Sequence, residues 1–259
     1  MGITITSQEK ALLKKVTIPP RPEALIKIGE ETKKPEPNVS NIAAIITADI
    51  SISAAVLQVV NSSFFRRMKE IQSIQQAVMT LGLKRLIPLV KSVALKAAMG
   101  NTAKLADFWD EASKLAGAVS VAADLLKKPN LKDHAYMLGL FHNAGVPIML
   151  LEFDDYPEVL ARADKDGWSA VSDEERRRYG TSHTTISAVL AQKWKLPAVM
   201  VETIYYQLDV EGLFTSGASK SIHRSHVVCF QLKGPLKLYI SHGGKDVYIF
   251  GRKKGAMQA

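Results

Sequence analysis

Apolar residues recur at three- and four-residue intervals along most of the chain, which is the spacing of amphipathic helices. In residues 83–99 the apolar positions fall on one helical face. The same pattern returns further on with Phe108, Ala112, Leu115, Val119, Ala122 and Leu126. The most hydrophobic segment, residues 132–153, is expected at the centre of the fold. These patterns predict an all-α protein of about ten to thirteen helices in two lobes.

Capping residues indicate where several of these helices begin and end. Ser40, or alternatively Asn41, is a candidate N-cap for one helix, and Asp49 can cap the next. The polar run that begins at Asn61 ends this second helix. Gly82 fits a C-terminal cap between two further helices.

Other breaks mark an extended segment, a lobe boundary and a distinct C-terminal segment. Residues 18–25 (IPPRPEAL) contain three prolines, which favour an extended conformation. The Gly-Asn-Thr turn residues at 100–102 allow a boundary between two lobes. Within residues 211–259, the stretch LKLYIS fits either a helix or a strand. This C-terminal segment is expected to be partly helical.

The composition is that of an ordinary globular protein, with 47% apolar and 23% charged residues in 259 positions. This length allows one large domain or two small ones. No apolar run approaches the roughly 20 residues of a membrane helix. The N-terminus lacks the apolar core of a secretory signal, and the single Cys229 fits a reducing compartment. We therefore expect a cytoplasmic protein that does not bind membranes.

The chain is basic, and most of the excess charge lies near its end. The net charge is +9, and residues 211–259 hold eight Lys or Arg against two Asp or Glu. Such a segment could bind nucleic acid or an acidic partner. No aromatic interleaving or nucleic-acid motif accompanies the charge, so a solvated, soluble tail is the favoured interpretation.

Seven blocks, taken in order, resemble the HDOD family, the HD-related output domain of bacterial signalling proteins. The first three are IPPRPEAL, ADISISAAVLQVVNSSFF and SIQQAVMTLGLKRL. The others are FWDEASKLA, GLFHNAG, YGTSHTTISAVLAQKWKLP and the helix that follows. Ile50 stands where the family usually has proline, and the chain beyond residue 211 matches only loosely. The likeness covers about residues 15–210.

The resemblance implies a multi-helix HD-domain-like fold with two lobes. Residues 1–103 would form the N-terminal helical lobe and residues 104–212 the HD-like lobe. Residues 213–259 would be the basic, partly helical C-terminal segment. The family is regarded as a regulatory or output module that is often non-catalytic.

The resemblance also places the metal site of HD phosphohydrolases on this chain. That site uses a His, an adjacent His-Asp pair and later His and Asp residues, because imidazoles and carboxylates hold a metal that generates hydroxide. The first matching position is Glu111, and the pair is His142–Asn143. His183 is retained, and Gln207 stands where a closing His-His pair would fall.

This residue set implies a vestigial metal site. An amide in place of the Asp supplies no negative charge to offset ligand desolvation. His142 is interpreted as a hydrogen-bonded core histidine, and Asn143 as an amide that ties helices together. His183 lies beside Ser182 and Thr184 and fits a polar helix start. No catalytic residue, metal or cofactor is expected.

The acidic clusters Asp154–Asp155 and Asp173–Glu175 are interpreted as helix-start charges that complement the helix dipole. An acid–base role is not favoured, because no partner group is identifiable opposite them.

Three functions remain in competition. The favoured one is a non-catalytic signalling module that binds a protein partner, with a small ligand possible in a cleft between the lobes. The second is a metal-dependent nucleotide phosphohydrolase that uses Glu111, His142 and His183. The third is a phosphate or nucleic-acid binder that uses the basic C-terminal segment.

Overall fold

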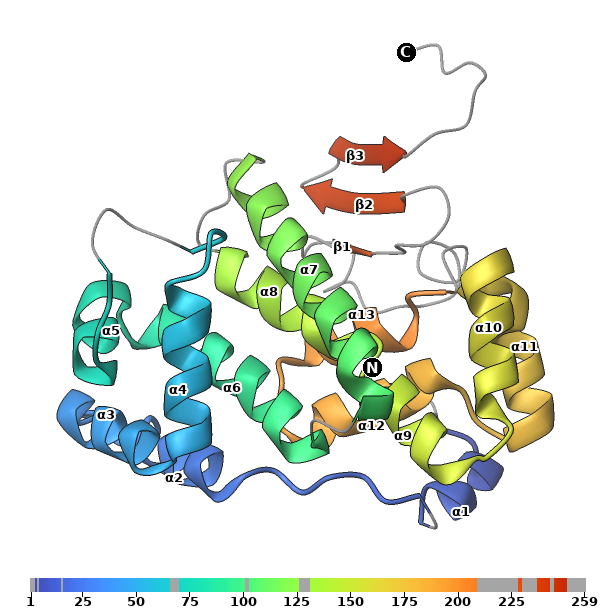
Figure 1. Cartoon of the computed structure of the whole chain (residues 1–259), viewed down its shortest axis with the longest axis horizontal. Helices are drawn as coiled ribbons and strands as arrows, with labels where there is room; N and C mark the ends of the chain where they lie inside the picture. Colours follow the sequence, from blue (N-terminus) through green and yellow to red (C-terminus); the bar gives the residue numbers. More distant parts are fainter. Residues whose placement is uncertain are drawn as a thin grey trace. The chain divides into compact units, whose positions relative to one another are not determined.

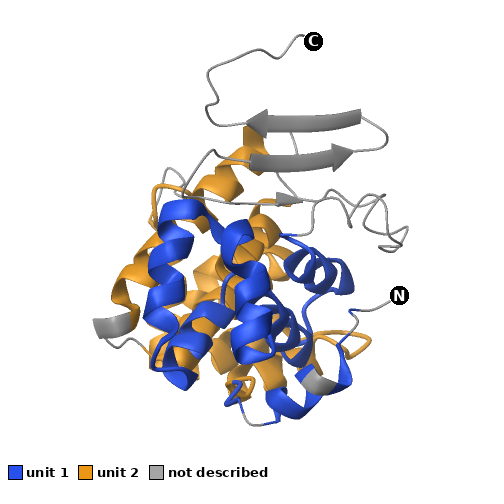
Figure 2. Cartoon of the chain, turned by 90° about the vertical axis from the view of Figure 1, so that its right-hand side faces the viewer, with its two compact units in different colours: residues 1–18, 142–259 blue, residues 19–141 orange. Residues whose placement is uncertain are grey.

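The computed structural model describes residues 3, 5–14, 16–65, 70–100, 103–125, 131–208, 228–229, 237–242 and 245–250. These residues form helices α1 to α13, followed by three short strands (Figure 1). The chain divides into two compact units, coloured separately in Figure 2. Unit 1 comprises Met1–Ile18 and His142–Ala259, and unit 2 comprises Pro19–Phe141. The all-α prediction is confirmed for the described residues up to position 208, where the elements are helices α1 to α13.

Unit 2 contains seven of the helices. They are α2 (Glu23–Glu31), α3 (Val39–Ala48), α4 (Ile50–Val60), α5 (Ile74–Leu81), α6 (Leu83–Met99), α7 (Ala103–Leu125) and α8 (Lys132–Phe141). The apolar face predicted for residues 83–99 is the buried face of α6, where Leu86, Leu89 and Val90 are fully buried. Helix α6 packs against α2, α4, α5 and α8, so it lies at the centre of unit 2.

Two specific contacts hold α8 against its neighbours α6 and α7 within unit 2. A Cβ atom at Gly139 would lie 2.6 Å from Ala116 Cα, so the glycine allows α8 to approach the backbone of α7 closely. Arg85 Nε of α6 donates to Oδ2 of the buried Asp133 of α8 at 2.7 Å. A charge-assisted hydrogen bond of this kind holds α8 against α6.

These contacts explain why the compact units differ from the expected division of 1–103 and 104–212. Helices α7 and α8 pack on each other and α8 packs on α6, so both belong to unit 2. The chain leaves unit 2 at Phe141 rather than near residue 103. The turn residues at 100–102 separate two helices of one unit, and tertiary packing decides which helices share a core.

Most of the expected helix ends are found, with one correction. Asp49 accepts a hydrogen bond from the Ile52 backbone N–H and caps α4, and Gly82 terminates α5 at φ 74°. The cap of α3, however, is Asn38, whose side chain accepts from the Asn41 N–H. The prediction of Ser40 or Asn41 was wrong, because the helix begins two residues earlier and Ser40 lies in its first turn.

His134 of α8 provides a test of packing in unit 2. Burial lowers the pKa of its imidazole below the ordinary value, the Asp133 carboxylate partly opposes this, and Lys91 adds to it. As pH falls through about 6.5, the unfolded chain therefore takes up a proton that the folded chain binds more weakly. The free energy of unfolding should fall in that window, and the contribution should be absent above it.

The variant His134→Gln should lose less stability than the wild type between about pH 8 and about pH 5.5. The measurement is the urea midpoint of both proteins at the two pH values. An equal loss in the two proteins would show that His134 is not the group responsible.

Unit 1 contains the remaining helices and the strands. The helices are α1 (Ser7–Leu13), α9 (Gly145–Glu152), α10 (Tyr156–Asp166), α11 (Trp168–Tyr179), α12 (His183–Lys193) and α13 (Ala198–Tyr205). Helix α12 packs against α9 and α13. Its residues are buried from His183 to Ala191, so it is the central helix of this unit.

In the C-terminal segment, the described residues are the strands β1 (Val228–Cys229), β2 (Lys237–His242) and β3 (Lys245–Phe250), which form an antiparallel sheet in the order β1-β2-β3. The stretch LKLYIS, for which the sequence left helix and strand open, contributes to β2, and the expectation of partial helix concerns residues outside those described. In the register of β2 and β3, His242 is opposite Lys245.

Among the described residues, no single helix combines the length and apolar character needed to cross a membrane. The pair α3 and α4 meets the criteria of length and composition only when taken together, and it is bent by 110°.

Candidate functional site

Three of the five predicted vestigial positions lie together in unit 1. His142 follows directly after α8 and is buried, Asn143 is half-buried, and Gln207 follows α13 and is buried. The Gln207 Nε2 amide donates to the His142 carbonyl at 2.8 Å and to Asn143 Oδ1 at 3.3 Å. The amide of Gln207 thus joins the chain after α13 to the His-Asn turn.

The fourth position, His183, is the first residue of α12 and is fully buried. Its Nδ1 atom lies 2.9 Å and 2.8 Å from the two carboxylate oxygens of Glu175. Because a carboxylate accepts hydrogen bonds, Nδ1 carries the proton that points at Glu175. Trp168 covers the imidazole, with ring centroids 4.1 Å apart.

Glu175 is the centre of a buried polar network. The Tyr156 hydroxyl donates to Glu175 Oε1 at 2.6 Å, and the His183 backbone N–H lies 3.4 Å from Oε2. Burial raises the pKa of Tyr156 well above its ordinary value, and the nearby Glu175 charge adds to the shift. The phenol therefore remains a donor at physiological pH.

Two polar atoms in this region have no hydrogen-bond partner among the described residues. They are His183 Nε2 and Thr181 Oγ1, both buried. In the neutral imidazole with its proton on Nδ1, Nε2 presents a lone pair. A carboxylate behind a histidine is the usual support of a metal-ligating imidazole. His183 thus keeps the form of a ligand.

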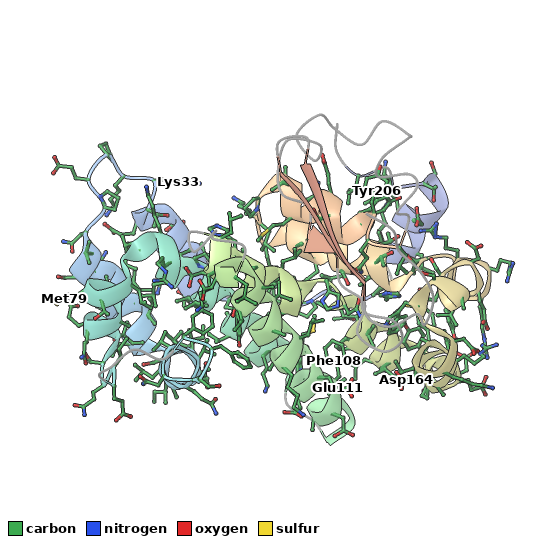
Figure 3. All side chains as sticks on the ribbon, turned by 90° about the horizontal axis from the view of Figure 1, so that it is seen from above. Lys33, Met79, Phe108, Glu111, Asp164 and Tyr206 are labelled. Atoms are coloured by element: carbon green, nitrogen blue, oxygen red, sulfur yellow. The ribbon has the colours of Figure 1, made fainter. Side chains whose placement is uncertain are left out.

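The fifth position, Glu111, belongs to unit 2. It is an exposed residue of α7 and is labelled in Figure 3. The other four positions all belong to unit 1. Unit 1 therefore brings His142, Asn143 and Gln207 into contact and carries His183 on α12. Glu111 belongs to unit 2.

The described residues do not fit the metal that the fold implies. No group of three or more His, Cys, Asp and Glu side chains among them is arranged to hold a metal ion. Asn143 Oδ1, which takes the place of the anionic ligand, accepts a hydrogen bond from Gln207. Structural and catalytic zinc sites use at least three protein ligands of suitable chemistry.

Sequence reasoning missed Glu175, which was interpreted as a helix-start charge. It is instead fully buried in the middle of α11. A signal was present, because Val171, Glu175 and Tyr179 are spaced four apart and form the buried face of α11. A carboxylate on an apolar stripe requires a buried partner, and His183 is that partner.

The buried polar side chains at the start of α12 were only partly expected. Ser182 caps the helix by accepting from the Thr185 N–H, as the sequence suggested. The Thr185 hydroxyl also donates to Glu9 of α1 at 3.2 Å, which fixes the N-terminal helix to α12. This contact spans 176 positions and could not be identified from local sequence.

The helical architecture and the His-Asn turn define a protein with an HD-domain-like, all-α fold. The HDOD domain family matches residues 18–210. The chain belongs to the HDOD family.

Similar structures support this fold. A Shewanella amazonensis SB2B protein named "Putative phosphohydrolase" is 28% identical, with a TM-score of 0.61 and coverage of 76% of this chain and 71% of that one. An HDOD domain protein of unknown function from Geobacter sulfurreducens is 23% identical, with a TM-score of 0.60 and coverage of 79% and 70%. The second likeness concerns the fold alone.

A curated relative is an uncharacterized protein of Treponema pallidum (strain Nichols), 29% identical over 195 residues. The match covers 73% of this chain but only 37% of that relative. The second, YuxH of Bacillus subtilis (strain 168), is 39% identical over 56 residues, which are 22% of this chain and 14% of YuxH. The chain thus spans much less than half the length of either relative.

Proposed function

We propose that this HDOD protein is a non-catalytic bacterial signalling module that acts through contact with a protein partner. The observation that carries the proposal is the link from Gln207 to the His142 carbonyl and to Asn143 Oδ1. The Asn143 amide occupies the place where a metal enzyme needs an anionic ligand, and its Oδ1 atom accepts a hydrogen bond from Gln207, which stands where a His ligand would fall.

The electrostatics of this link favour structure over catalysis. The protons of the Gln207 amide face the carbonyl oxygens of the His-Asn turn, so those oxygens are already in use. The amide of Asn143 is neutral and does not compensate a divalent cation as a carboxylate would. The Gln207 amide thus satisfies the two oxygens of the turn without a metal.

A phosphohydrolase is the second candidate. Two observations favour it: the name of the Shewanella amazonensis protein, and the lone pair of His183 Nε2 that has no partner among the described residues. Hydrolysis would still need a metal-bound hydroxide, and that requires more ligands than the described part of unit 1 brings together.

The experiment that separates the two is elemental analysis of the purified full chain for iron, manganese, zinc, nickel and magnesium. We expect far less than one equivalent of any metal, also after incubation with manganese or iron. Hydrolysis of a phosphodiester should not exceed that of the His183→Ala variant. One reproducible equivalent of metal that is lost in both His142→Ala and His183→Ala would overturn the proposal.

The variant Asn143→Asp sharpens this experiment. It supplies the carboxylate of the HD pair while keeping an Oδ1 atom that can accept the hydrogen bond from Gln207 Nε2. If only Asn143 prevents metal binding, this variant binds one equivalent. If the site is degenerate at several positions, as proposed, the variant remains metal-free.

The salt dependence of binding tests whether the partner is a protein or a nucleic acid. The immobilised full chain is exposed to a lysate of the source organism at increasing salt concentrations. A protein partner held by apolar contact should remain bound, whereas phosphate-driven binding of nucleic acid to the basic segment weakens steeply with salt. Retention of nucleic acid alone would favour the third function over the proposed one.

A further inference from the structure

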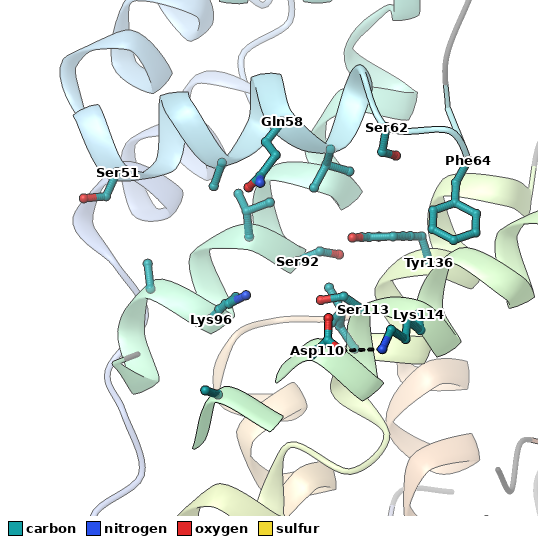
Figure 4. Close-up of a pocket in the computed structure, with 16 residues that line it drawn as sticks. Ser51, Gln58, Ser62, Phe64, Ser92, Lys96, Asp110, Ser113, Lys114 and Tyr136 are labelled. Atoms are coloured by element: carbon teal, nitrogen blue, oxygen red, sulfur yellow. Dashed lines mark ion pairs between the residues drawn. The ribbon is translucent and has the colours of Figure 1, made fainter. Parts of the chain in front are cut away.

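A pocket of about 840 Å³ lies within unit 2, lined by residues of α4, α6, α7 and α8 and of the turn after α4 (Figure 4). Its lining runs from Ser51 to Leu140, so all of it belongs to this unit. Sites for small organic ligands in proteins enclose about 300 to 1,000 Å³. The pocket therefore has the volume of a ligand site.

Three hydrogen-bond donors in this pocket lack a partner among the described residues. The hydroxyl of Tyr136 points into the pocket, and this side chain is only 5% exposed (Figure 4). The Ser62 hydroxyl is buried and makes no hydrogen bond. Lys96 is half-buried and also lines the pocket, and no carboxylate among the described residues forms an ion pair with its ammonium. A buried donor without a partner, such as the Ser62 hydroxyl, is rare in folded proteins and is expected where a ligand supplies the acceptor.

Burial raises the pKa of Tyr136 to about 12, so the phenol stays protonated and donates throughout the physiological range. The phenol thus adds a permanent donor that faces the pocket.

Two serines that line the pocket supply hydrogen-bond acceptors in addition to these donors. Ser92 donates its proton to the Pro88 carbonyl at 2.9 Å, and Ser113 donates to the Trp109 carbonyl at 2.6 Å. Both hydroxyls therefore keep lone pairs while they line the pocket. These oxygens can accept from a hydroxyl or amine of a ligand.

The charge of the lining is positive. Asp110 neutralises Lys114 in an ion pair drawn in Figure 4, which leaves Lys96 as the uncompensated charge among the lining residues. A single cation beside neutral donors matches a carboxylate or phosphate group.

The rest of the wall is apolar and includes one aromatic ring. Val59, Val93, Leu140 and Phe64 line the pocket. The Phe64 ring lies directly against Gly117 of α7, where a Cβ atom would be only 2.4 Å from it. The glycine lets the ring lie close to the helix, where it forms a flat wall suited to a planar group.

We propose that the pocket of unit 2 binds a small organic anion, with its carboxylate or phosphate group held by Lys96, its other polar atoms hydrogen-bonded by the Tyr136 and Ser62 hydroxyls, and its apolar or aromatic body against Phe64. Such a ligand would give the HDOD module a chemical input separate from the His-Asn turn. The anion satisfies the donors that the protein leaves unmet, and the body fills the apolar part of the volume.

The proposal is tested by isothermal titration calorimetry of the full chain with benzoate, phenyl phosphate and inorganic phosphate. The neutral counterparts benzamide and phenol are titrated in parallel. We expect benzoate or phenyl phosphate to saturate in the millimolar range or tighter, with the neutral counterparts at least about tenfold weaker, because a charge-assisted hydrogen bond is lost. Which of the two binds identifies the carboxylate or the phosphate as the anionic group.

Three variants locate the binding. Lys96→Gln should weaken the bound anion about tenfold or more, and Tyr136→Phe about three- to tenfold, because each removes one donor. Lys84→Gln is the matched control, since Lys84 is an exposed residue of the same helix α6 and does not line the pocket. Its affinity should equal that of the wild type. Tyr136→Phe retains the ring and its edge contact with Phe65, so the fold is preserved.

Three outcomes would overturn the proposal. In the first, neither organic anion saturates. In the second, a neutral counterpart binds as tightly as its anion, which would leave an apolar pocket only. In the third, Lys84→Gln weakens binding as much as Lys96→Gln, which would indicate general attraction to a basic surface.

Discussion

Replacing Gly145 with alanine is expected to lower the free energy of unfolding by about 3 kcal/mol or more. A Cβ atom at this position would lie 2.1 Å from the His183 carbonyl oxygen and 3.0 Å from the Ser187 backbone nitrogen. Both atoms belong to the backbone of α12, which is buried and cannot move aside easily. The Gly145 N–H also donates to Ser187 Oγ at 2.7 Å, and this bond would be lost as α9 moves away. The measurement is urea unfolding followed by circular dichroism.

Gly29 offers a matched control in a helix of unit 2. A Cβ atom there would meet only the Arg21 guanidinium at 3.4 Å, an ordinary contact with the end of a flexible side chain. Because alanine favours helix over glycine, Gly29→Ala should raise the free energy of unfolding by about 0.5–1 kcal/mol. If the two variants change stability in the same direction, the close approach of α9 to α12 is not the cause.

Replacing Glu175 with alanine is expected to lower the free energy of unfolding by about 2–5 kcal/mol. The substitution leaves His183 Nδ1 and the Tyr156 hydroxyl buried without an acceptor. Each unsatisfied buried donor costs about 1–3 kcal/mol, and the lost side chain also leaves a small cavity. The start of α12 should loosen, which can be followed by amide hydrogen exchange at Thr184 and Thr185.

Two further variants test whether the loss of stability comes from the buried network around Glu175. Glu175→Gln keeps an acceptor for Tyr156 but removes the charge beside His183, so its effect should be intermediate. Asp173→Ala removes an exposed carboxylate of the same helix and should change stability by less than about 0.5 kcal/mol. An effect of Glu175→Ala as small as that of Asp173→Ala would contradict the buried network.

The helices of this fold were largely predictable, because each depends on local sequence. The apolar face of residues 83–99, the cap at Asp49 and the terminator Gly82 all lie where the pattern placed them. Their signals come from residues three or four positions apart. The cap of α3 was misplaced by two residues, since several side chains near Asn38 can cap a helix.

The division into units was not predictable in the same way. Gly-Asn-Thr at 100–102 is a credible boundary in sequence, yet Arg85 and Asp133, 48 positions apart, join α6 to α8. Which residue pairs with a buried charge depends on the tertiary structure and not on the local sequence. The C-terminal strands are a related case, because the segment LKLYIS suits both helix and strand until β3 pairs with it.

The candidate site was predictable in its residue types and not in its contacts. The His-Asn pair and the retained His183 were read from the family pattern, and their interpretation as a vestige remains a prediction. Glu175, eight residues before His183, was assigned to the surface because acidic runs at helix starts usually are. Only the packing of α11 shows that it supports the imidazole.

The sequence by itself determined the helical class, most helix ends and the identity of the residues at the HD positions, since these follow from spacing and residue type. The tertiary structure alone decided that Gln207 joins the His-Asn turn, that Glu175 supports His183, and that Tyr136, Ser62 and Lys96 face one pocket. The physical reason is that burial and partner choice depend on residues brought together from distant parts of the chain. An unmet donor can be recognised only when every atom around it is known.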